Sequence, residues 1–472
     1  MRSKNSAAML RTRTVSPGRQ CSRSDFSGWG RTTSSVAEDC VVSGYAELTE
    51  AITTASTRGV IARGFGRAAG DASQNAGGRV VRLEGEFSEP AVHWIDWERR
   101  VARVSAGASF AAVMRALLSQ GWFLPTPGTT GHMTIGGAFA SDHLTAAQSR
   151  RGSLAANTEA VGLVDGRGRE LRLEPRGKSA PEFWATAAGL GMTGVITSLD
   201  VRVVPVTSAW MVVESARHDR IDDVLSDLER ASSLYPYSYA LLDTSASGDC
   251  LGRGTVSAAR HAVVSELPEH RQHEALDFDQ VGGRARRRQV PDQLLRPATS
   301  RLVQGLAFRA APRREVEQLQ PASMFFHVDD RSSWTAPVSE HGLLTYQVSI
   351  PQDRTDLIAH LLEGLANERI VSQRCLLIKL ANHQSGALSF ETPGWALSIE
   401  FPQQCQQLSA TLDTFDEQLA AAGGRAALSN DARLLADVAP AMYPNLPVWQ
   451  SARSRLDPEH RFRSDLVSRL QL

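Results

Sequence analysis

The sequence lacks an excess of charge of either sign. Lysine and arginine together number 51, aspartate and glutamate also number 51, and the formal net charge is zero. A dedicated nucleic-acid-binding protein carries a strongly basic domain, so we expect no nucleic-acid partner. Long hydrophobic runs are missing too, because no stretch approaches the ~18 consecutive apolar residues of a membrane span. We therefore expect at most peripheral contact with a membrane.

Cysteine is scarce and unpatterned. The 472 residues contain five cysteines, and none of them forms a C-x-x-C pair. This spacing predicts neither a disulfide framework nor a metal site, and it fits a reducing compartment. The cysteines are Cys21, Cys40, Cys250, Cys375 and Cys405.

The first 27 residues are basic and lack the apolar segment of a secretory signal. We expect a disordered, solvated tail over 1–27, with weak attraction to acidic lipid as the alternative. The predicted location is cytoplasmic, with peripheral attachment at the inner membrane as the alternative. The remaining chain exceeds what one hydrophobic core usually organises, which favours two domains.

A glycine-rich stretch, "ARGFGRAAGD", separates two predicted strands, "GVIAR" and "GGRVVRL". Its glycines read G-x-G-x-x-x-G, one residue longer than the dinucleotide-binding turn, and no helix follows. Backbone N–H groups in such a loop can still form an anion-binding nest, since glycine adopts the positive φ that a nest needs. A plain surface loop is the alternative.

The stretch "GLGMTG" matches G-x-G-x-x-G letter for letter but follows a predicted helix and precedes a predicted strand. The Rossmann motif requires the opposite order, so we expect a helix-to-strand turn here and no NAD site. A third glycine cluster, "PGTTGHMTIGGAFASD", follows an amphipathic helix that places Phe110, Val113, Met114, Leu117 and Leu118 on one face. Its small residues would let a bulky cofactor approach the backbone.

These three segments, in this order, resemble the FAD domain of the vanillyl-alcohol-oxidase, or PCMH-type, flavoproteins. Within that family the chain most resembles the bacterial decaprenylphosphoryl-ribose oxidases, through "GWGRTTSSVA", "YPYSYALLD", "PGWALSIEFP" and the C-terminal "AMYPNLPVWQSARSRLDPEHRFRSDLVSRL". The resemblance implies an α+β fold: an FAD-binding domain over 28–207, an antiparallel-sheet substrate domain with helices on one face over 208–424, and a segment over 425–472 that returns to the FAD domain.

The resemblance also implies the cofactor, FAD. The family's covalent members carry a histidine where this chain has Arg67, so the FAD is expected to be non-covalent. The expected cofactor-binding residues are Ala62, Arg63, Gly64, Phe65, Gly66, Arg67, Ala68, Ala69, Gly70, Asp71, Ala72, Gly128, Thr129, Thr134, Ile135, Gly136, Gly137, Ser141, Asp142, His143, Leu144, Gly194 and Ile196.

The polar substrate-site residues of the resembled oxidases are mostly replaced. Leu144, Ala146, Ser398 and Asn430 stand where the relatives carry a histidine, a lysine, a reactive cysteine and a second lysine, and the relatives' two tyrosines are Ala69 and Ala427. The candidate catalytic residues that remain are Lys379, Gln347 and His143.

The expected reaction is oxidation of the CH–OH group of a sugar-like or polyprenyl-phosphosugar alcohol, a cell-wall arabinan precursor among the resembled oxidases, by hydride transfer to flavin N5. The alternatives are oxidation of another alcohol or an aldonolactone on the same scaffold, and a non-catalytic FAD-binding paralogue. The resemblance also implies an NAD-dependent reductase as a possible partner.

Overall fold

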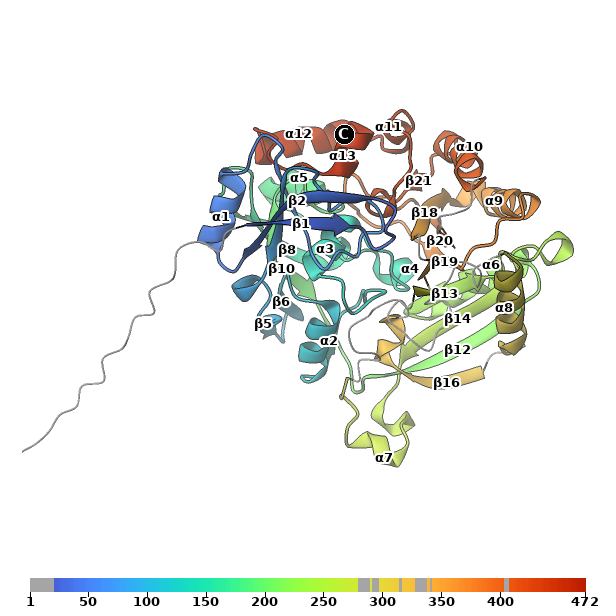
Figure 1. The fold of residues 1–472 in the computed structure, drawn as a ribbon. Coiled ribbons are helices and arrows are strands. Elements are labelled where there is room, and N and C mark those ends of the chain that lie inside the picture. The colour runs from blue at the N-terminus through green and yellow to red at the C-terminus, as the bar shows by residue number, and fades with distance from the viewer. Residues whose placement is uncertain are drawn as a thin grey trace, which may run out of the picture.

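Figure 1 shows the computed structural model, in which two sheet-based regions are joined by a helical C-terminal segment. The structure describes residues 21–278, 289–290, 297–313, 316–326, 338–339, 342–402 and 407–472. Over these ranges, no helix is both long enough and apolar enough to cross a membrane.

The N-terminal domain contains two sheets and is drawn in blue to green in Figure 1. One sheet has the order β1-β2-β4-β3, with β2, β4 and β3 parallel, and the other is antiparallel with the order β5-β6-β10-β8-β9. The bounds of these strands, and of the pair β7 and β11, are β1 Ser22–Ser27, β2 Ser34–Val42, β3 Val60–Ala62, β4 Arg79–Leu83, β5 Val92–Asp96, β6 Val101–Ser105, β7 Trp122–Phe123, β8 Thr158–Val164, β9 Glu170–Leu173, β10 Val195–Arg202 and β11 Val204–Pro205.

Short helices pack around these sheets because their apolar residues recur at helical spacing. In α2 all five residues of the predicted apolar face are buried, and Ser109 caps its first turn. The helices of this domain are α1 Tyr45–Thr53, α2 Phe110–Leu118, α3 Ile135–Ser141, α4 Gln148–Arg151 and α5 Ala180–Thr186.

The second domain is built on one antiparallel sheet with the strand order β16-β12-β14-β13-β19-β20-β18-β21. Its bounds are β12 Trp210–His218, β13 Tyr237–Leu242, β14 Gly254–His261, β16 Val316–Pro321, β18 Leu343–Pro351, β19 Arg374–Leu380, β20 Gly394–Pro402 and β21 Arg425–Ala426. The helices are α6 Ile221–Leu234, α7 Glu269–Gln272, α8 Pro297–Ala310, α9 Asp356–Asn367 and α10 Leu408–Ala421, and a small parallel pair joins β15 Gln289–Val290 to β17 Val338–Ser339.

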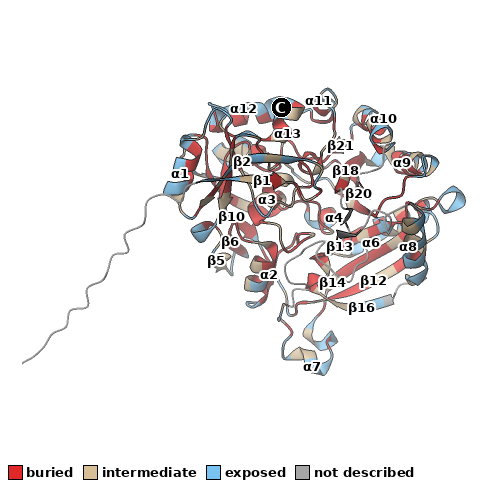
Figure 2. Ribbon diagram, viewed as in Figure 1, coloured by how far each residue is buried: buried red, intermediate tan, exposed pale blue. Residues whose placement is uncertain are grey.

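One face of the large sheet is covered by α6, α9 and α10, which share a core with alternate residues of β20 and β18. Trp395, Leu397, Ile399 and Phe401 of β20 are almost completely buried there (Figure 2). Each such side chain contributes about 1.5–3 kcal/mol of burial free energy. The opposite face packs against the N-terminal domain, for example through contacts of α4 with β13 and β19. The sheets and the helices around them confirm the α+β fold expected from the sequence.

The C-terminal segment contains α11 Ala439–Met442, α12 Leu446–Leu456 and α13 Asp465–Leu470. It returns to the N-terminal domain, since α12 packs on α5 and Phe462 bridges to Val60 of β3. The boundary expected at 424/425 is shifted, however, because β21 is still an edge strand of the large sheet.

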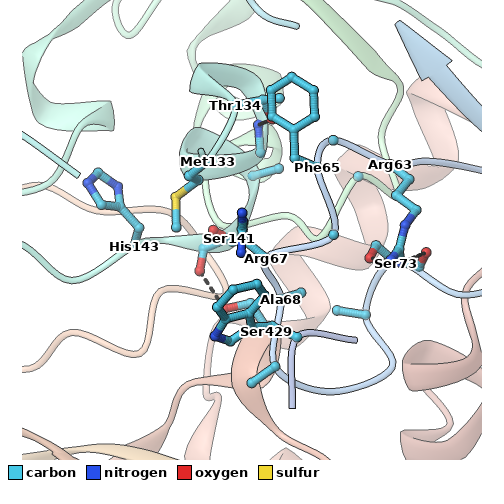
Figure 3. Close-up of a pocket in the computed structure, with 18 of the residues that line it drawn as sticks. Arg63, Phe65, Arg67, Ala68, Ser73, Met133, Thr134, Ser141, His143 and Ser429 are labelled. Carbon is cyan, nitrogen blue, oxygen red and sulfur yellow. Dashed lines mark hydrogen bonds between the residues drawn. The ribbon is translucent and has the colours of Figure 1, made fainter. Parts of the chain in front are cut away.

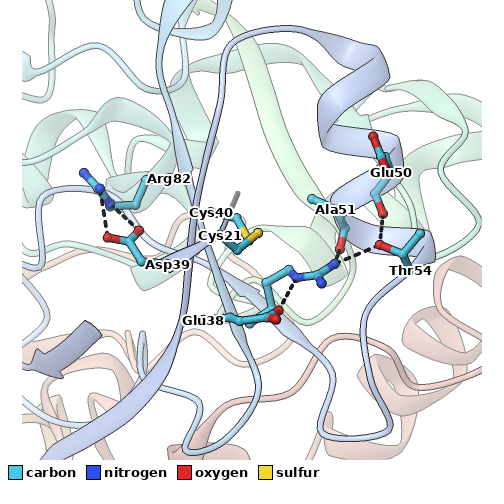
Figure 4. Close-up of a disulfide and its surroundings, with 9 residues drawn as sticks. Cys21, Glu38, Asp39, Cys40, Glu50, Ala51, Thr54 and Arg82 are labelled. Atoms are coloured by element: carbon cyan, nitrogen blue, oxygen red, sulfur yellow. Dashed lines mark hydrogen bonds and ion pairs between the residues drawn. A yellow bond between two sulfur atoms is a disulfide. The ribbon is translucent and has the colours of Figure 1, made fainter. Parts of the chain in front are cut away.

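The N-terminal tail differs from the prediction in two ways. Residues 22–27, expected to be disordered, form β1, which pairs with β2, whereas 1–20 lie outside the described residues. Cys21 and Cys40 form a disulfide across this pair (Figure 4), which corrects the expectation of unpaired cysteines. The partners are 19 residues apart and meet only through the strand register. The inference of a reducing compartment rested on unpaired cysteines and loses that support.

The disulfide lies beside the carboxylate of Glu38, and these three side chains come within 4.8 Å of one another. The sulfurs are bonded to each other and are therefore not thiolate ligands. The Glu38 carboxylate accepts a hydrogen bond from Arg79 Nε at 2.8 Å (Figure 4). The disulfide therefore links the start of β1 covalently to β2.

Candidate functional site

A cavity of about 550 Å³ lies between the glycine-rich segments of the N-terminal domain and the open face of the large sheet. Figure 3 shows Phe65, Arg67 and Ala68 on one segment near Met133, Thr134 and Ser141 on another. The predicted cofactor residues that line this cavity are Ala62, Arg63, Gly64, Phe65, Gly66, Arg67, Ala68, Ala69, Ala72, Thr129, Thr134, Gly136, Gly137, Ser141, His143, Leu144, Gly194 and Ile196.

The loop after β3 presents backbone donors to the cavity. Among the described residues, the N–H groups of Gly64, Phe65, Gly66 and Ala68 have no hydrogen-bond acceptor. Gly66 has φ 67°, a conformation that glycine adopts without steric cost. A run of free N–H groups at a positive-φ turn is an anion-binding nest, so the loop fits a pyrophosphate.

Two arginines support the loop. The Arg63 guanidinium donates to Ser73 Oγ at 2.9 Å and to the Ser27 carbonyl at 2.6 Å. Burial, and then the charge of Arg82, lower the pKa of Arg63. Arg67 lies over the Trp29 ring, 3.9 Å from guanidinium carbon to ring centroid. Both arginines line the cavity, and Arg63 also holds the loop through its hydrogen bonds to Ser73 and Ser27.

Helix α3 brings a second backbone segment to the cavity. Thr134 caps α3 by accepting from the Gly137 N–H at 3.2 Å, and the same hydroxyl lies 2.3 Å from where a Cβ on Gly64 would be. Gly136 donates its N–H to the Ala106 carbonyl at 2.8 Å. The glycines thus allow α3, β6 and the loop to meet without intervening side chains.

The turn from α5 to β10 forms a third part of the wall, as the helix-then-strand order of "GLGMTG" predicts. Leu190 and Gly191 both have positive φ there, 58° and 74°. Leu190 holds a left-handed conformation that costs a non-glycine residue roughly 1–2 kcal/mol. The turn is fixed by hydrogen bonds from the Ala188 and Leu190 N–H groups to the Phe139 and Ala140 carbonyls.

Five residues predicted to bind the cofactor do not line the cavity. Asp71 accepts two hydrogen bonds from Arg469 of α13, each 3.0 Å. Asp142 accepts from Ser389 Oγ at 2.6 Å and from the Phe390 N–H at 3.2 Å. These carboxylates join the loop and α3 to later parts of the chain. Of the other three, Gly70 and Gly128 let Asp431 and Phe110 pack closely against the backbone, and Ile135 is buried in the core.

Lys379, the leading catalytic candidate, is placed wrongly by the sequence prediction. Its ammonium group lies over the Trp395 ring at 4.3 Å and pairs with Glu229 of α6 at 3.1 Å. Successive residues of a strand face opposite sides of the sheet, and Lys379 lies on the helix-covered side. It does not line the cavity.

The other two catalytic candidates do line it. Gln347 Oε1 accepts from Asn430 Nδ2 at 2.9 Å, which fixes the amide. His143 packs against Phe110, and burial lowers its pKa to about 4. An imidazole with this pKa is neutral at pH 7 and a weak base, which counts against His143 as the acceptor of a substrate proton.

The cavity face of the large sheet carries two cross-strand rows. Thr345, Glu400 and Arg374 are paired in one row, and Gln347, Ser398 and Leu376 in the next. Two residues along a strand separate the rows, which corresponds to about 7 Å. The Arg374 guanidinium pairs with the Glu400 carboxylate at 2.7 Å.

Arg374 and Glu400 were missed by the sequence prediction, as was Trp29. Period-two alternation would have grouped Arg374 with Leu376, but β19 reads "RCLLIKL" and is apolar on both faces. The pattern therefore does not decide which face meets the cavity. Ser398, Asn430, Ala69 and Leu144, four of the replaced family positions, do line it, whereas Ala146 and Ala427 do not.

Comparisons of the sequence with known proteins identify an FAD-binding domain in the part of the chain that forms the loop after β3 and α3. Residues 40–174 match the family model described as an FAD binding domain. A decaprenylphosphoryl-beta-D-ribose oxidase from Mycolicibacterium smegmatis is 29% identical over 455 residues, which cover 94% of this chain and 97% of that protein.

Two further relatives come from Streptomyces. A protein of Streptomyces coelicolor, described as an uncharacterized protein in the mprA 5' region, is 33% identical over 363 residues, 75% of this chain and 98% of that protein. An alditol oxidase from a Streptomyces species is 28% identical over 128 residues, 27% of this chain and 29% of that protein.

Proposed function

The chain belongs to the PCMH-type family of FAD-binding oxidoreductases, and on that premise we propose that it oxidises the CH–OH group of a sugar-like or polyprenyl-phosphosugar alcohol. The observation that carries the proposal is one cavity that joins a backbone N–H nest to the polar face of a sheet. FAD, when bound, supplies a flavin ring that accepts a hydride at N5.

The residues of the N-terminal domain fit this cofactor. The N–H groups of Gly64, Phe65, Gly66 and Ala68 would hold the pyrophosphate, with the charge of Arg67 close by. Gly136 and Gly137 leave room for a bulky ring against the start of α3. Arg67 stands where the covalent members of the family carry a histidine, so the FAD is proposed to be non-covalent and to be released by acid precipitation.

The sheet supplies the groups that would orient an alcohol. Gln347 and Arg374 offer N–H donors, and Glu400 is a carboxylate on the same wall. We assign to Glu400, rather than to the weakly basic His143, the task of accepting a hydrogen bond from a substrate hydroxyl. The relatives named as a decaprenylphosphoryl-ribose oxidase and an alditol oxidase support a polyhydroxylated substrate.

Two alternatives follow from the replaced residues. Leu144 and Ala69 make parts of the wall apolar where the resembled oxidases carry a histidine and a tyrosine, which favours a different alcohol or an aldonolactone. A non-catalytic FAD-binding paralogue is the second alternative. An NAD-dependent reductase partner, and a cytoplasmic location with at most peripheral contact with the inner membrane, stay predictions.

The test is anaerobic reduction of the FAD-loaded protein. Candidate sugars, polyols, phosphosugars and lactones are added to the oxidised protein, and the flavin absorption is followed before and after readmission of oxygen. Bleaching by an alcohol supports the proposal, and bleaching by a lactone alone favours the first alternative. Flavin that stays oxidised with every candidate supports the paralogue.

A further inference from the structure

Two carboxyl groups meet where the N-terminal domain packs against the large sheet. Asp142 ends α3 with φ 55°, and Glu391 lies in the loop over 381–393, between β19 and β20. Their side chains are hydrogen-bonded to each other. Asp142 is only 8% exposed, so this contact is largely shielded from water.

Hydrogen bonds from both domains hold the two carboxyl groups in place. Asp142 accepts from Ser389 Oγ at 2.6 Å and from the Phe390 N–H at 3.2 Å. Gln148 of α4 donates its amide N–H to the Glu391 carboxyl group. The acid pair of Asp142 and Glu391 therefore joins α3 and α4 of the N-terminal domain to the loop before β20.

The other titratable groups that face Asp142 are Arg425 and Tyr443. The charge of Arg425 acts on Asp142, but its guanidinium donates to the Ser389 carbonyl at 2.8 Å. Burial raises the pKa of Tyr443, which therefore stays a neutral phenol. Neither group supplies a proton or a direct ion pair to the acid pair.

The acid pair holds one proton at neutral pH. Two carboxyl groups in contact away from water do not both ionise readily, because like charges repel and burial disfavours each charge. Burial raises the pKa of Asp142 to about 6, and burial with the charge of Asp142 also raises the pKa of Glu391. Glu391 thus keeps its proton and donates it to the Asp142 carboxylate.

The acid pair lies where the two walls of the cavity meet. Ser141 and His143, the chain neighbours of Asp142, line one wall, and Leu376 of β19 and Ser398 of β20 line the other. We propose that Asp142 and Glu391 are positioning residues that keep these walls together around the cofactor by sharing one proton. The inference goes beyond the proposed function and rests on it only in taking FAD as the occupant of the cavity.

Loss of the shared proton weakens this closure. When the walls separate, Glu391 returns to its ordinary pKa of about 4.5 and releases its proton to solvent. Closure therefore weakens by up to about tenfold per pH unit, until Glu391 ionises in the closed state as well. Asp142 acts in the same direction only up to about pH 6, so at higher pH the change belongs to Glu391.

The rate of FAD release from the loaded protein, followed by flavin fluorescence after dilution, tests the inference. Between about pH 7 and about pH 9, release from the wild type should accelerate about tenfold or more. Glu391→Gln keeps a donor to Asp142 and an acceptor for Gln148 but cannot ionise, so its release should stay slow at both pH values. Glu391→Ala should release FAD fast at both, and this contrast separates the proton from packing alone.

Infrared spectroscopy detects the proton directly and needs no bound FAD. The difference spectrum of wild type and Glu391→Gln at pH 7 should contain the carbonyl band of a protonated carboxyl group. Asp243→Asn is the matched control, because Asp243 is a buried carboxylate of the same domain that pairs with Arg253 at 2.7 Å and does not line the cavity. It should keep the wild-type pH dependence of FAD release.

Melting temperatures show whether each variant is folded, and Glu391→Gln keeps the test valid if Glu391→Ala does not fold. The inference is overturned if the infrared band is absent, if wild-type release does not respond to pH, or if Glu391→Gln responds as the wild type does. FAD that is bound but never reduced by an alcohol contradicts the proposed oxidation, and both readouts of the acid pair still apply. FAD that is reduced by an alcohol but released at the same rate at every pH supports the oxidation and overturns the inference.

Discussion

Gly64 is the residue at which the glycine-rich loop after β3, the cofactor loop, packs against the cap of α3. A Cβ at this position would lie 2.3 Å from Thr134 Oγ1 and 3.2 Å from Thr134 Cβ, so the α3 cap would have to move. The cap fixes the first turn of α3, where Gly136 and Gly137 line the cavity. A methyl group added at Gly64 would therefore disturb the part of α3 that lines the cavity and weaken the binding of FAD.

We predict that Gly64→Ala weakens FAD binding at least tenfold, as measured by fluorescence titration of the apoprotein. Gly364→Ala in α9 is the control, because its Cβ would meet nothing closer than 3.9 Å and alanine favours a helix. Equal FAD affinity in Gly64→Ala and wild type would contradict the geometry of the loop.

Asp142 is a second residue whose effect can be worked out. Burial raises its pKa to about 6, against hydrogen bonds from Ser389, Phe390 and Glu391 and the charge of Arg425, which lower it. Burial, and then the charge and hydrogen bond of Asp142, raise the pKa of Glu391. The folded protein keeps the Asp142 proton up to about pH 6, whereas the unfolded chain loses it near pH 4. Stability from this group therefore falls as the pH rises from about 4 to about 6.

Asp142→Asn cannot lose this proton and keeps an oxygen to accept from Ser389 and Phe390. We predict that the fall in unfolding free energy between pH 4.5 and pH 7 becomes smaller in the variant, by about 2 kcal/mol. Urea unfolding at the two pH values measures it. A fall of the same size in both proteins would show that Asp142 is ionised in the fold.

At the scale of elements, sequence patterns succeeded where one face is polar and the other apolar. The amphipathic helix over 110–118 and the two strands that flank the glycine-rich loop, at 60–62 and 79–83, lie where the sequence predicts them. The same patterns failed for β19, in which Arg374 and Lys379 stand among apolar residues. Only the pairing with β20 decides which of the two charged residues meets the cavity. Glycine spacing located the cofactor loop but not the carboxylates behind it.

The disulfide is an element-scale feature that no local pattern could reveal, because it depends on the register of β1 and β2. It ties down the strand whose Ser24, Asp25 and Phe26 line the cavity rim. A covalent loop of this length stabilises a fold by about 3 kcal/mol in the chain-entropy model.

Cys21→Ser should therefore lower the melting temperature of the oxidised protein, and dithiothreitol should lower that of the wild type to a similar value. Cys250→Ser is the control, because Cys250 is a free, exposed cysteine. A wild-type melting temperature that does not respond to dithiothreitol would indicate that the two sulfurs are not bonded in the isolated protein.

At the scale of the whole molecule, the C-terminal helix α13 holds the glycine-rich loop after β3 to the segment that follows β21. Arg469 pairs with Asp71 at 3.0 Å and with Asp431 at 2.9 Å, and the hydrogen bond and charge of these two carboxylates raise its pKa against the effect of burial. Among the described residues, no other guanidinium forms an ion pair with either carboxylate, although the charge of Arg433 also acts on Asp431. One side chain thus links the loop after β3 to two parts of the C-terminal segment, Asp431 and α13.

We predict that Arg469→Gln lowers stability by about 2–3 kcal/mol, since it leaves two poorly solvated carboxylates side by side. FAD should also dissociate faster, because Asp71 lies in the same loop as the nest, shortly after Ala68. Thermal unfolding and the rate of FAD release measure the two effects. Arg455→Gln is the comparison, as its pair with Glu182 at 2.6 Å is on the surface and is worth at most about 1 kcal/mol. An equal loss of stability in Arg469→Gln and Arg455→Gln would contradict the claim that the Arg469 pairs are worth more than a surface ion pair.

The most direct test of the central claim is the visible absorption spectrum of the purified protein under anaerobic conditions, before and after addition of a polyhydroxylated alcohol. The account predicts flavin bands that bleach when the alcohol is added and return with oxygen. A protein that shows no flavin bands even after incubation with FAD would contradict the assignment of the loop after β3 as the site that holds this cofactor.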